Sequence, residues 1–324
     1  MVENKAVHEW LIGTNPWTEY NTRINLLGQK KDEPEVLEAK REMLAHPLVI
    51  NLLQDINKWP WCGLKRHNDA NHPLHKLVFL ADLGLTREEK AIATVGEKIF
   101  RCQSDEGAFQ LPIQIPKAFG GNDQEQLTWM LCDTPSLLYT LIKFGWEKDS
   151  RVKKALRHLA GLQQENGWLC TVSPTLGKFR GPGRKDDPCP YATLISLKAL
   201  ITHPEYYKSK ISIKGAEVLL TLWEQRKERK PYLFGMGTDF CKLKAPYIWY
   251  DILHIASVLT QLDWLKKDER VNDMMDIIRV KANEQKLFTA ESIWNAWKEW
   301  DFGQKKIPSP WITYLFYLTE KGII

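Results

Sequence analysis

Five segments of the chain share one pattern, in which a proline or an aromatic residue opens a run of apolar residues at helical spacing. Each segment is apolar on nearly all faces, which indicates a helix that is buried on both sides. Proline at the first helical position is typical of a helix start. The segments are HPLHKLVFLADLGL, DTPSLLYTLIKFGW, CPYATLISLKAL, YIWYDILHIASVLTQL and SPWITYLFYLTEKG; they align on Pro73, Pro135, Pro190, Trp249 and Pro310 and so recur about every 60 residues.

More amphipathic helices are expected between these segments, with charged residues on their outer faces. Each repeat is then an outer helix, a turn, a long loop and an inner helix. One hairpin cannot bury both faces of its inner helix, whereas several hairpins closed into a ring can. The sequence therefore predicts an all-α ring of inner and outer helices. The expected outer helices are roughly Glu35–Ala45, Thr86–Cys102, Arg151–Gln164, Ile213–Gln225 and Glu269–Gln285.

The bulk composition favours one globular domain over residues 1–324, in which residues 1–35 form an N-terminal cap. Hydrophobic residues make up 44% and charged residues 26%, and no linker-like run divides the chain. The net charge of +5 comes without a basic face, which argues against nucleic-acid binding. We expect no signal peptide and no membrane span. Six scattered cysteines indicate a reduced, cytoplasmic chain.

Two predicted outer helices end in related turns. Gln103 is followed four residues later by Gly107, and Gln163 by Gly167 and then Trp168. Glycine supplies a positive φ, and the aromatic residue packs back between hairpins. These turns, in register with the inner helices, resemble the α/α toroid superfamily of squalene and terpene cyclases and protein prenyltransferase catalytic subunits. The resemblance covers the chain from about residue 40 onward and implies an α/α toroid.

A metal site is indicated where two neighbouring inner helices begin. Asp187 and Cys189 straddle the start of the third inner helix, and His254 lies on the fourth. Oxygen, sulfur and nitrogen ligands suit tetrahedral zinc with one open position. The catalytic (beta) subunit of protein prenyltransferases has a similar Asp-x-Cys and a downstream His, which implies zinc on these three residues and a substrate thiol as nucleophile. The alternative is a helix cap, a small core residue and a structural histidine.

A basic loop precedes this site. In the family that the chain resembles, Arg and Lys at this place hold the diphosphate of an isoprenoid donor, which implies the same role for Arg180, Arg184 and Lys185. Tyr191 lies one place after a family tyrosine that contacts the diphosphate. The chain departs from the pattern at Cys132–Asp133, where the family has a diphosphate-binding His. The family enzymes also act with a separate helical-repeat partner subunit.

A histidine cluster opens the first inner helix, from His67 to His75. His72 and His75 are spaced to share a helix face, so they are candidate catalytic residues, together with Asp251 near His254. Three options stand for the cluster: metal binding, acid–base or anion binding, or structural hydrogen bonds. Asp69 and Asn71 are the expected caps of this helix.

Three function classes follow. The resemblance implies a zinc-dependent transferase that acts on an isoprenoid-like or peptide substrate. The second class is a carbohydrate hydrolase or lyase that uses paired carboxylates, and the third is a non-catalytic ring that binds isoprenoid or peptide. Terpene cyclases that start by protonation have an acidic Asp where this chain has Cys189, which argues against that chemistry. The carboxylate pairs are Asp105/Glu106 and Asp186/Asp187; Trp129, Tyr139, Trp249 and Trp311 are candidate funnel residues.

Overall fold

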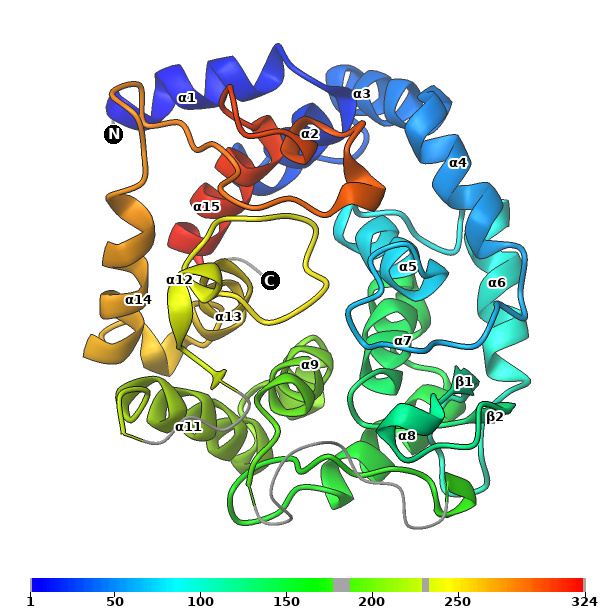
Figure 1. Cartoon of the computed structure of the whole chain (residues 1–324). Coiled ribbons are helices and arrows are strands. Elements are labelled where there is room, and N and C mark those ends of the chain that lie inside the picture. Colours follow the sequence, from blue (N-terminus) through cyan, green and yellow to red (C-terminus); the bar gives the residue numbers. More distant parts are fainter. Residues whose placement is uncertain (1, 177–186, 229–232, 323–324) are drawn as a thin grey trace. The chain divides into compact units, whose positions relative to one another are not determined.

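The computed structural model describes residues 2–176, 187–228 and 233–322 (Figure 1). Within these ranges the chain is mostly helical, with one two-stranded sheet, so the predicted all-α class is confirmed at this level. None of the helices in the described ranges is long and apolar enough to cross a membrane.

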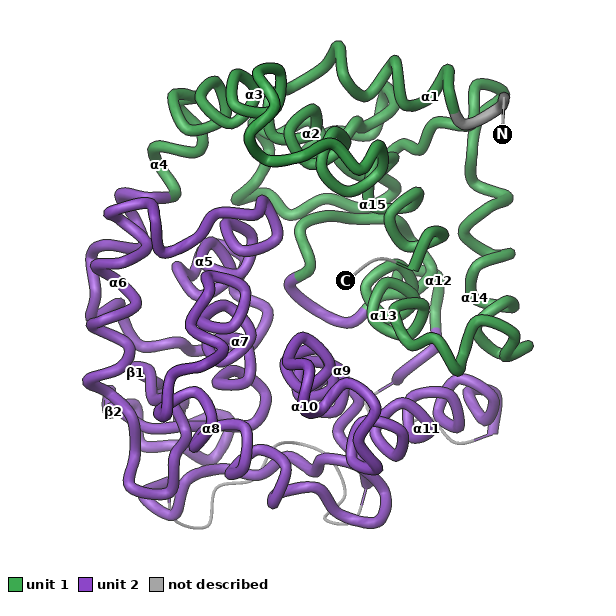
Figure 2. The backbone as a smooth tube through the Cα atoms, turned by 180° about the vertical axis from the view of Figure 1, so that it is seen from behind, with its two compact units in different colours: residues 1–52, 237–247, 251–324 green, residues 53–236, 248–250 purple. Residues whose placement is uncertain are grey.

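The backbone divides into two compact units (Figure 2). Unit 1 contains residues 1–52, 237–247 and 251–324, and unit 2 contains residues 53–236 and 248–250. Helix α4 (Pro47–Ile56) carries the chain from unit 1 into unit 2.

Three inner helices form the core of unit 2. Helix α7 (Thr134–Leu141) packs between α5 (Pro73–Asp82) and α9 (Pro190–Ile201), as Figure 1 shows. Every residue of α7 and α9 is buried, which agrees with the prediction that these helices are apolar on all faces. A π-helical turn, η3 (Ile142–Trp146), continues α7. The outer helices are α6 (Lys90–Phe100), α8 (Ser150–Gly161) and α11 (Lys210–Glu224).

The two predicted turns make the same contact in successive repeats. The side-chain amide of Gln103 donates to the carbonyl of Arg151 near the start of α8, and that of Gln163 donates to the carbonyl of Ile211 near the start of α11, both at 2.8 Å. Each glutamine thus ties the end of one outer helix to the start of the next. The turn glycines have φ of +118° at Gly107 and +100° at Gly167, as predicted.

The C-terminal ends of the inner helices also meet. The Tyr139 hydroxyl on α7 donates to the carboxylate of Asp82 on α5 at 2.5 Å. The Lys198 ammonium on α9 lies 3.6 Å from the same carboxylate and 4.3 Å from the centre of the Tyr139 ring. These contacts join the C-terminal halves of the three inner helices of unit 2.

A small antiparallel sheet follows α6 in a stretch that the sequence predicts as loop. Strand β1 (Leu111–Gln114) pairs with β2 (Glu125–Thr128), with Leu111 opposite Thr128. The first three residues of β1, Leu111, Pro112 and Ile113, are all buried, so burial along this strand does not alternate. Unit 2 also contains η2 (Lys117–Phe119), η4 (Pro174–Leu176) and α10 (Pro204–Tyr207).

Unit 1 joins the two ends of the chain. Helix α15 (Pro310–Lys321) packs against α13 (Ile252–Leu259), α2 (Pro16–Asn21) and η1 (Thr22–Leu26). The Asn25 amide donates to the Tyr314 hydroxyl at 2.8 Å. Helices α2 and η1 therefore pack on α15, while the role of residues 1–35 as a cap stays a prediction. The other elements are α1 (Val2–Ile12), α3 (Pro34–Ala45), α12 (Gly237–Phe240), η6 (Asp263–Leu265), α14 (Glu269–Arg279), η7 (Asn295–Trp297) and η8 (Asp301–Gly303).

Several predicted boundaries are wrong; for example, α11 begins at Lys210 rather than Ile213, and α14 ends at Arg279 rather than Gln285. The first full outer helix of unit 2 begins at Lys90 rather than Thr86, because Thr86 N–H and the Glu89 carboxylate form a local turn at 2.6 Å. The fourth inner helix begins at Ile252 rather than near Trp249. The Asp251 carboxylate accepts from the backbone N–H of His254 at 3.0 Å and so caps this helix.

Candidate functional site

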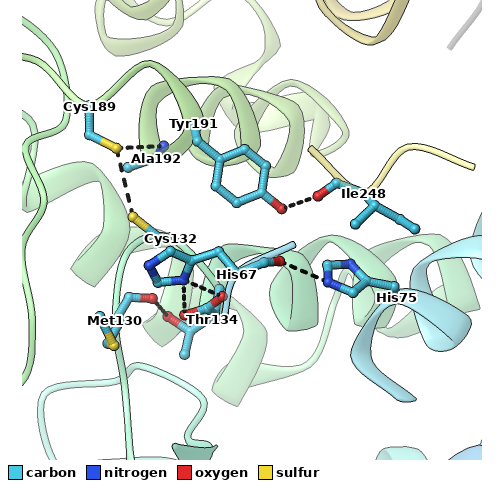
Figure 3. A network of polar contacts seen from close by, with 10 residues as sticks. His67, His75, Met130, Cys132, Thr134, Cys189, Tyr191, Ala192 and Ile248 are labelled. Carbon is cyan, nitrogen blue, oxygen red and sulfur yellow. Dashed lines mark hydrogen bonds and ion pairs between the residues drawn. The ribbon is translucent and has the colours of Figure 1, made fainter. Parts of the chain in front are cut away.

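The residues that precede α5, α7 and α9 meet at one end of unit 2 (Figure 3). His67 comes from the loop before α5, Cys132 and Asp133 from the start of α7, and Cys189 from the start of α9. Cys170 lies on the segment that follows α8. We call these five residues the N-terminal cluster. They bring together a cation, a carboxylate and three thiols.

The first part of the cluster is an ion pair. Nδ1 of His67 lies 3.0 Å from both carboxylate oxygens of Asp133. Asp133 is almost fully buried, with 2% of its side chain exposed, whereas 30% of the His67 side chain is exposed. Burial alone would lower the pKa of His67, but the charge of Asp133 and the hydrogen bond to it outweigh burial and raise that pKa to about 9. His67 is therefore an imidazolium at neutral pH.

Two further histidines hold the loop that carries His67. Nε2 of His72 donates to the carbonyl of Cys62 at 2.9 Å, and its Nδ1 accepts from the N–H of Leu74 at 3.2 Å. Nε2 of His75 donates to the carbonyl of His67, also at 2.9 Å. Burial lowers the pKa of His72 and brings the pKa of His75 to about 4, so both rings are neutral at neutral pH. These contacts agree with the option that the histidines make structural hydrogen bonds. A catalytic role for either ring stays a prediction.

The cap of α5 differs from the expected one. His72 is the N-cap, and the Asp69 carboxylate instead accepts from the N–H of Asn71 at 3.1 Å within the loop. The reason is Pro73, which occupies the first helical turn and makes the preceding residue the cap. The His-Pro dipeptides at His46 and His203 cap their helices in the same way, each with Nδ1 accepting a backbone N–H. A His-Pro dipeptide in this sequence therefore indicates a helix start that the histidine caps.

The thiols form the second part of the cluster. Sγ of Cys132 lies 3.7 Å from Sγ of Cys189, and both side chains are buried. Cys189 is the N-cap of α9, and its sulfur accepts from the N–H of Ala192 at 3.4 Å. Hydrogen-bonding contacts with Cys170 and Cys189, together with burial, raise the pKa of the Cys132 thiol. None of the six cysteines is in a disulfide.

Aromatic rings line the cluster. The Tyr191 hydroxyl donates to the carbonyl of Ile248 at 2.8 Å and so holds the segment 248–250 against α9. The Trp249 ring lies 4.3 Å from the Tyr191 ring. It is also parallel to the His67 ring at a centroid distance of 6.2 Å. Trp249 thus contributes an apolar face beside the imidazolium. The diphosphate contact predicted for Tyr191 stays a prediction.

The predicted zinc ligands lie in both units. Asp187 and Cys189 precede α9 in unit 2, and His254 lies on α13 in unit 1. Their oxygen, sulfur and nitrogen donors fit the chemistry of zinc. Among the described residues no group of three or more His, Cys, Asp or Glu side chains surrounds a common position. The donor types therefore fit zinc, while the described geometry contains no preformed site. Arg180, Arg184 and Lys185 lie outside the described residues.

Asp251 is the predicted catalytic carboxyl of unit 1. One carboxylate oxygen caps α13, and the other is buried without a hydrogen-bond partner among the described residues. Burial, opposed by the charge of Lys244, raises the pKa of Asp251 to about 7. His254 stacks on Tyr247, with ring centroids 4.5 Å apart. Asp251 is therefore both a helix cap and an acid that titrates near neutral pH.

Sequence reasoning missed the pairing of His67 with Asp133 and the contacts among the three thiols. A signal for one of these contacts exists in the repeat. Cys132 and Cys189 are 57 residues apart, the same separation as in the contacts Asp82–Tyr139 and Tyr191–Ile248. When the inner helices are aligned with a shift of 57 residues, Cys132 and Cys189 fall at equivalent positions. His67 lies in an irregular loop, for which no periodic signal applies.

Comparison with known proteins gave no match, either to a protein-family model or to a curated protein.

Proposed function

We propose that the chain is a zinc-dependent transferase on an α/α toroid, resembling protein prenyltransferases. Asp187, Cys189 and His254 would hold the zinc. The observation that carries the proposal is the position of Cys189, whose sulfur lies at the start of a buried inner helix within 3.7 Å of a second thiol. Cys189 is thus at the start of an inner helix, where the resemblance to prenyltransferase catalytic subunits would put a zinc ligand.

The repeat supports the toroid. Successive hairpins of unit 2 use the same glutamine contact and the same period of 57 residues. Unit 1 also packs an inner helix, α13, against an outer helix, α14. Closure of these hairpins into one ring over residues 1–324 is part of the proposal.

The chain's own residues would recognise an anionic, apolar co-substrate. When bound, zinc lowers the pKa of a thiol that coordinates it. The imidazolium of His67 offsets the charge of Asp133, which would otherwise repel a diphosphate. Trp249 and Tyr191 offer aromatic faces for an isoprenoid chain. Arg180, Arg184 and Lys185 would bind the diphosphate.

The co-substrates follow from this chemistry. The donor would be an isoprenoid diphosphate, and the acceptor a thiol on a peptide or small molecule. Six thiols without a disulfide suit a reducing compartment, and we place the reaction in the cytoplasm. His72, His75 and Asp251 would orient or exchange protons with these substrates.

Turnover with defined substrates tests the proposal. The zinc-supplemented protein is incubated with isoprenoid diphosphates of several lengths and a cysteine peptide, and the products are read by mass spectrometry. We expect a thioether product that disappears with a chelator and in Cys189→Ser, but persists in the matched variant Cys62→Ser, which alters an exposed thiol. Tight isoprenoid binding without product would favour the non-catalytic ring. Glycoside cleavage that survives the chelator would favour the hydrolase.

A further inference from the structure

A small cavity lies in unit 2 between the inner helix α7 and the outer helix α8, which pack against each other. Its volume is about 20 Å³, just above the roughly 10–15 Å³ that a single water molecule needs. Most of its wall is apolar and includes Phe109, Leu138, Ala155 and Leu159. None of the residues that line it is a proposed zinc ligand or a member of the N-terminal cluster, so the cavity can be considered independently of the proposed transferase.

Trp129, one of the candidate funnel residues, lines this cavity and brings a hydrogen-bond donor to it. Only 3% of the residue is exposed, and its indole nitrogen Nε1 is buried without a hydrogen-bond partner among the described residues. A buried indole N–H usually finds an acceptor, as that of the neighbouring Trp168 does at the Leu159 carbonyl, at 2.9 Å. The unpaired donor of Trp129 therefore points to a ligand that supplies the acceptor.

His158 brings a second unpaired nitrogen to the same cavity. Its ring lies edge-on to the Trp129 ring, with centroids 5.1 Å apart, and its Nε2 is buried without a hydrogen-bond partner among the described residues. Burial lowers the pKa of His158 despite the opposing charge of Glu106, so the ring is neutral at neutral pH. A neutral imidazole with its proton on Nδ1 offers Nε2 as an acceptor. The cavity thus has a fixed donor and an acceptor on adjacent rings.

A hydroxyl group matches these polar atoms. Its oxygen can accept from the indole while its hydrogen donates to the imidazole. Thr134 also lines the cavity; its hydroxyl donates to the Met130 carbonyl at 3.0 Å and can still accept a further hydrogen bond. Among the described residues that line the cavity, none carries a full charge at neutral pH, and the cost of burying an unpaired charge disfavours an ionic ligand.

We propose that this cavity is a binding site for one small neutral molecule, held through a hydroxyl group between Trp129 Nε1 and His158 Nε2. The hydroxyl belongs to a water molecule or to a short alcohol, whose apolar end would contact Leu138 and Ala155. A second hydrogen, which only water has, donates to the Thr134 hydroxyl. The bound molecule connects the outer helix α8, which carries His158, to the segment that leads into α7.

Nuclear magnetic resonance of the indole N–H groups in the full chain tests this assignment. The Trp129 signal is identified by its loss in Trp129→Phe, which keeps an aromatic wall. We expect a rotating-frame Overhauser contact, distinct from hydrogen exchange, between this N–H and a bound water. In dilute ethanol, a contact that stays with water identifies water as the ligand, whereas replacement by contacts to the ethanol carbons identifies the alcohol. The indole N–H of Trp168, which donates to a carbonyl, is the internal control and should contact neither.

Two variants of His158 identify the second partner. His158→Leu removes the acceptor and should abolish the contact of the Trp129 N–H with the ligand, whereas His158→Gln keeps an acceptor and should retain it. If a variant does not fold, the comparison of Trp129 with Trp168 in the wild type still decides the matter. A wild-type Trp129 N–H that contacts neither water nor ethanol would overturn the proposal, as would a contact that persists unchanged in a folded His158→Leu.

Discussion

Replacement of His67 by glutamine tests the ion pair at the start of α7. An amide keeps a hydrogen-bond donor near Asp133 but cannot carry a proton charge. The pKa of His67 rises from 6.5 to about 9 on folding. Each pKa unit corresponds to about 1.4 kcal/mol, so the shift corresponds to about 3 kcal/mol. Because 30% of the side chain is exposed, screening by solvent reduces the expected contribution to about 1–3 kcal/mol.

The sign of the pH dependence follows from linkage. A group whose pKa is raised in the folded state contributes its full stabilisation below its unfolded pKa and loses it as the pH rises through the folded value. The wild type should therefore be more stable than His67→Gln at pH 6, and the difference should shrink as the pH approaches the folded pKa of about 9.

Urea unfolding of both proteins at several pH values between these limits measures the difference. Arg66→Gln is the matched control, since it removes a charge from the same loop at an exposed position. Its free energy of unfolding should stay parallel to that of the wild type. If the His67→Gln curve also stays parallel to the wild-type curve, His67 is not held as an imidazolium by Asp133.

Three further predictions concern the scaffold. Gly167→Ala should lower the free energy of unfolding by about 1–3 kcal/mol in a denaturation assay, because φ is +100° and a Cβ would lie 3.0 Å from Val218. The control is Gly161→Ala, which lies at an open position without positive φ and should be neutral or slightly stabilising in the same assay. Gln163→Leu should cost about 1–2 kcal/mol in thermal or chemical unfolding, because the carbonyl at the start of α11 loses its donor. The folded pKa of His75 is about 4, so the free energy of unfolding should fall by up to about 3 kcal/mol as the pH drops from 6.5 toward 4. His75→Gln should make the free energy of unfolding depend less steeply on pH in this range. If the dependence is unchanged in the variant, His75 titrates normally in the folded protein.

The sequence predicts the inner helices well because their signals are local. Pro73, Pro135, Pro190 and Pro310 each lie in the first turn of a helix, as expected from the fixed φ of proline. The fourth repeat has no such proline. The pattern predicts its start too early because the apolar residues before Asp251 extend the helical pattern without belonging to the helix.

The candidate site is only partly readable from the sequence. Cys189 is found because it lies beside Asp187 and Pro190 at a helix start, and the repeat period leads from it to Cys132. The partner of Asp133 is not predictable in this way. His67 reaches it from an irregular loop, which His72 and His75 hold through hydrogen bonds to the carbonyls of Cys62 and His67. Such contacts depend on tertiary packing and leave no period in the sequence.

Metal analysis of the purified protein tests the central claim most directly. Zinc per chain is measured by elemental mass spectrometry after dialysis against zinc and then buffer, for the wild type, Cys189→Ser, His254→Ala and the control Cys62→Ser. The account predicts about one zinc in the wild type and in Cys62→Ser, and loss of zinc in the two ligand variants. A wild type that stays metal-free, or ligand variants that keep full zinc occupancy, would contradict it.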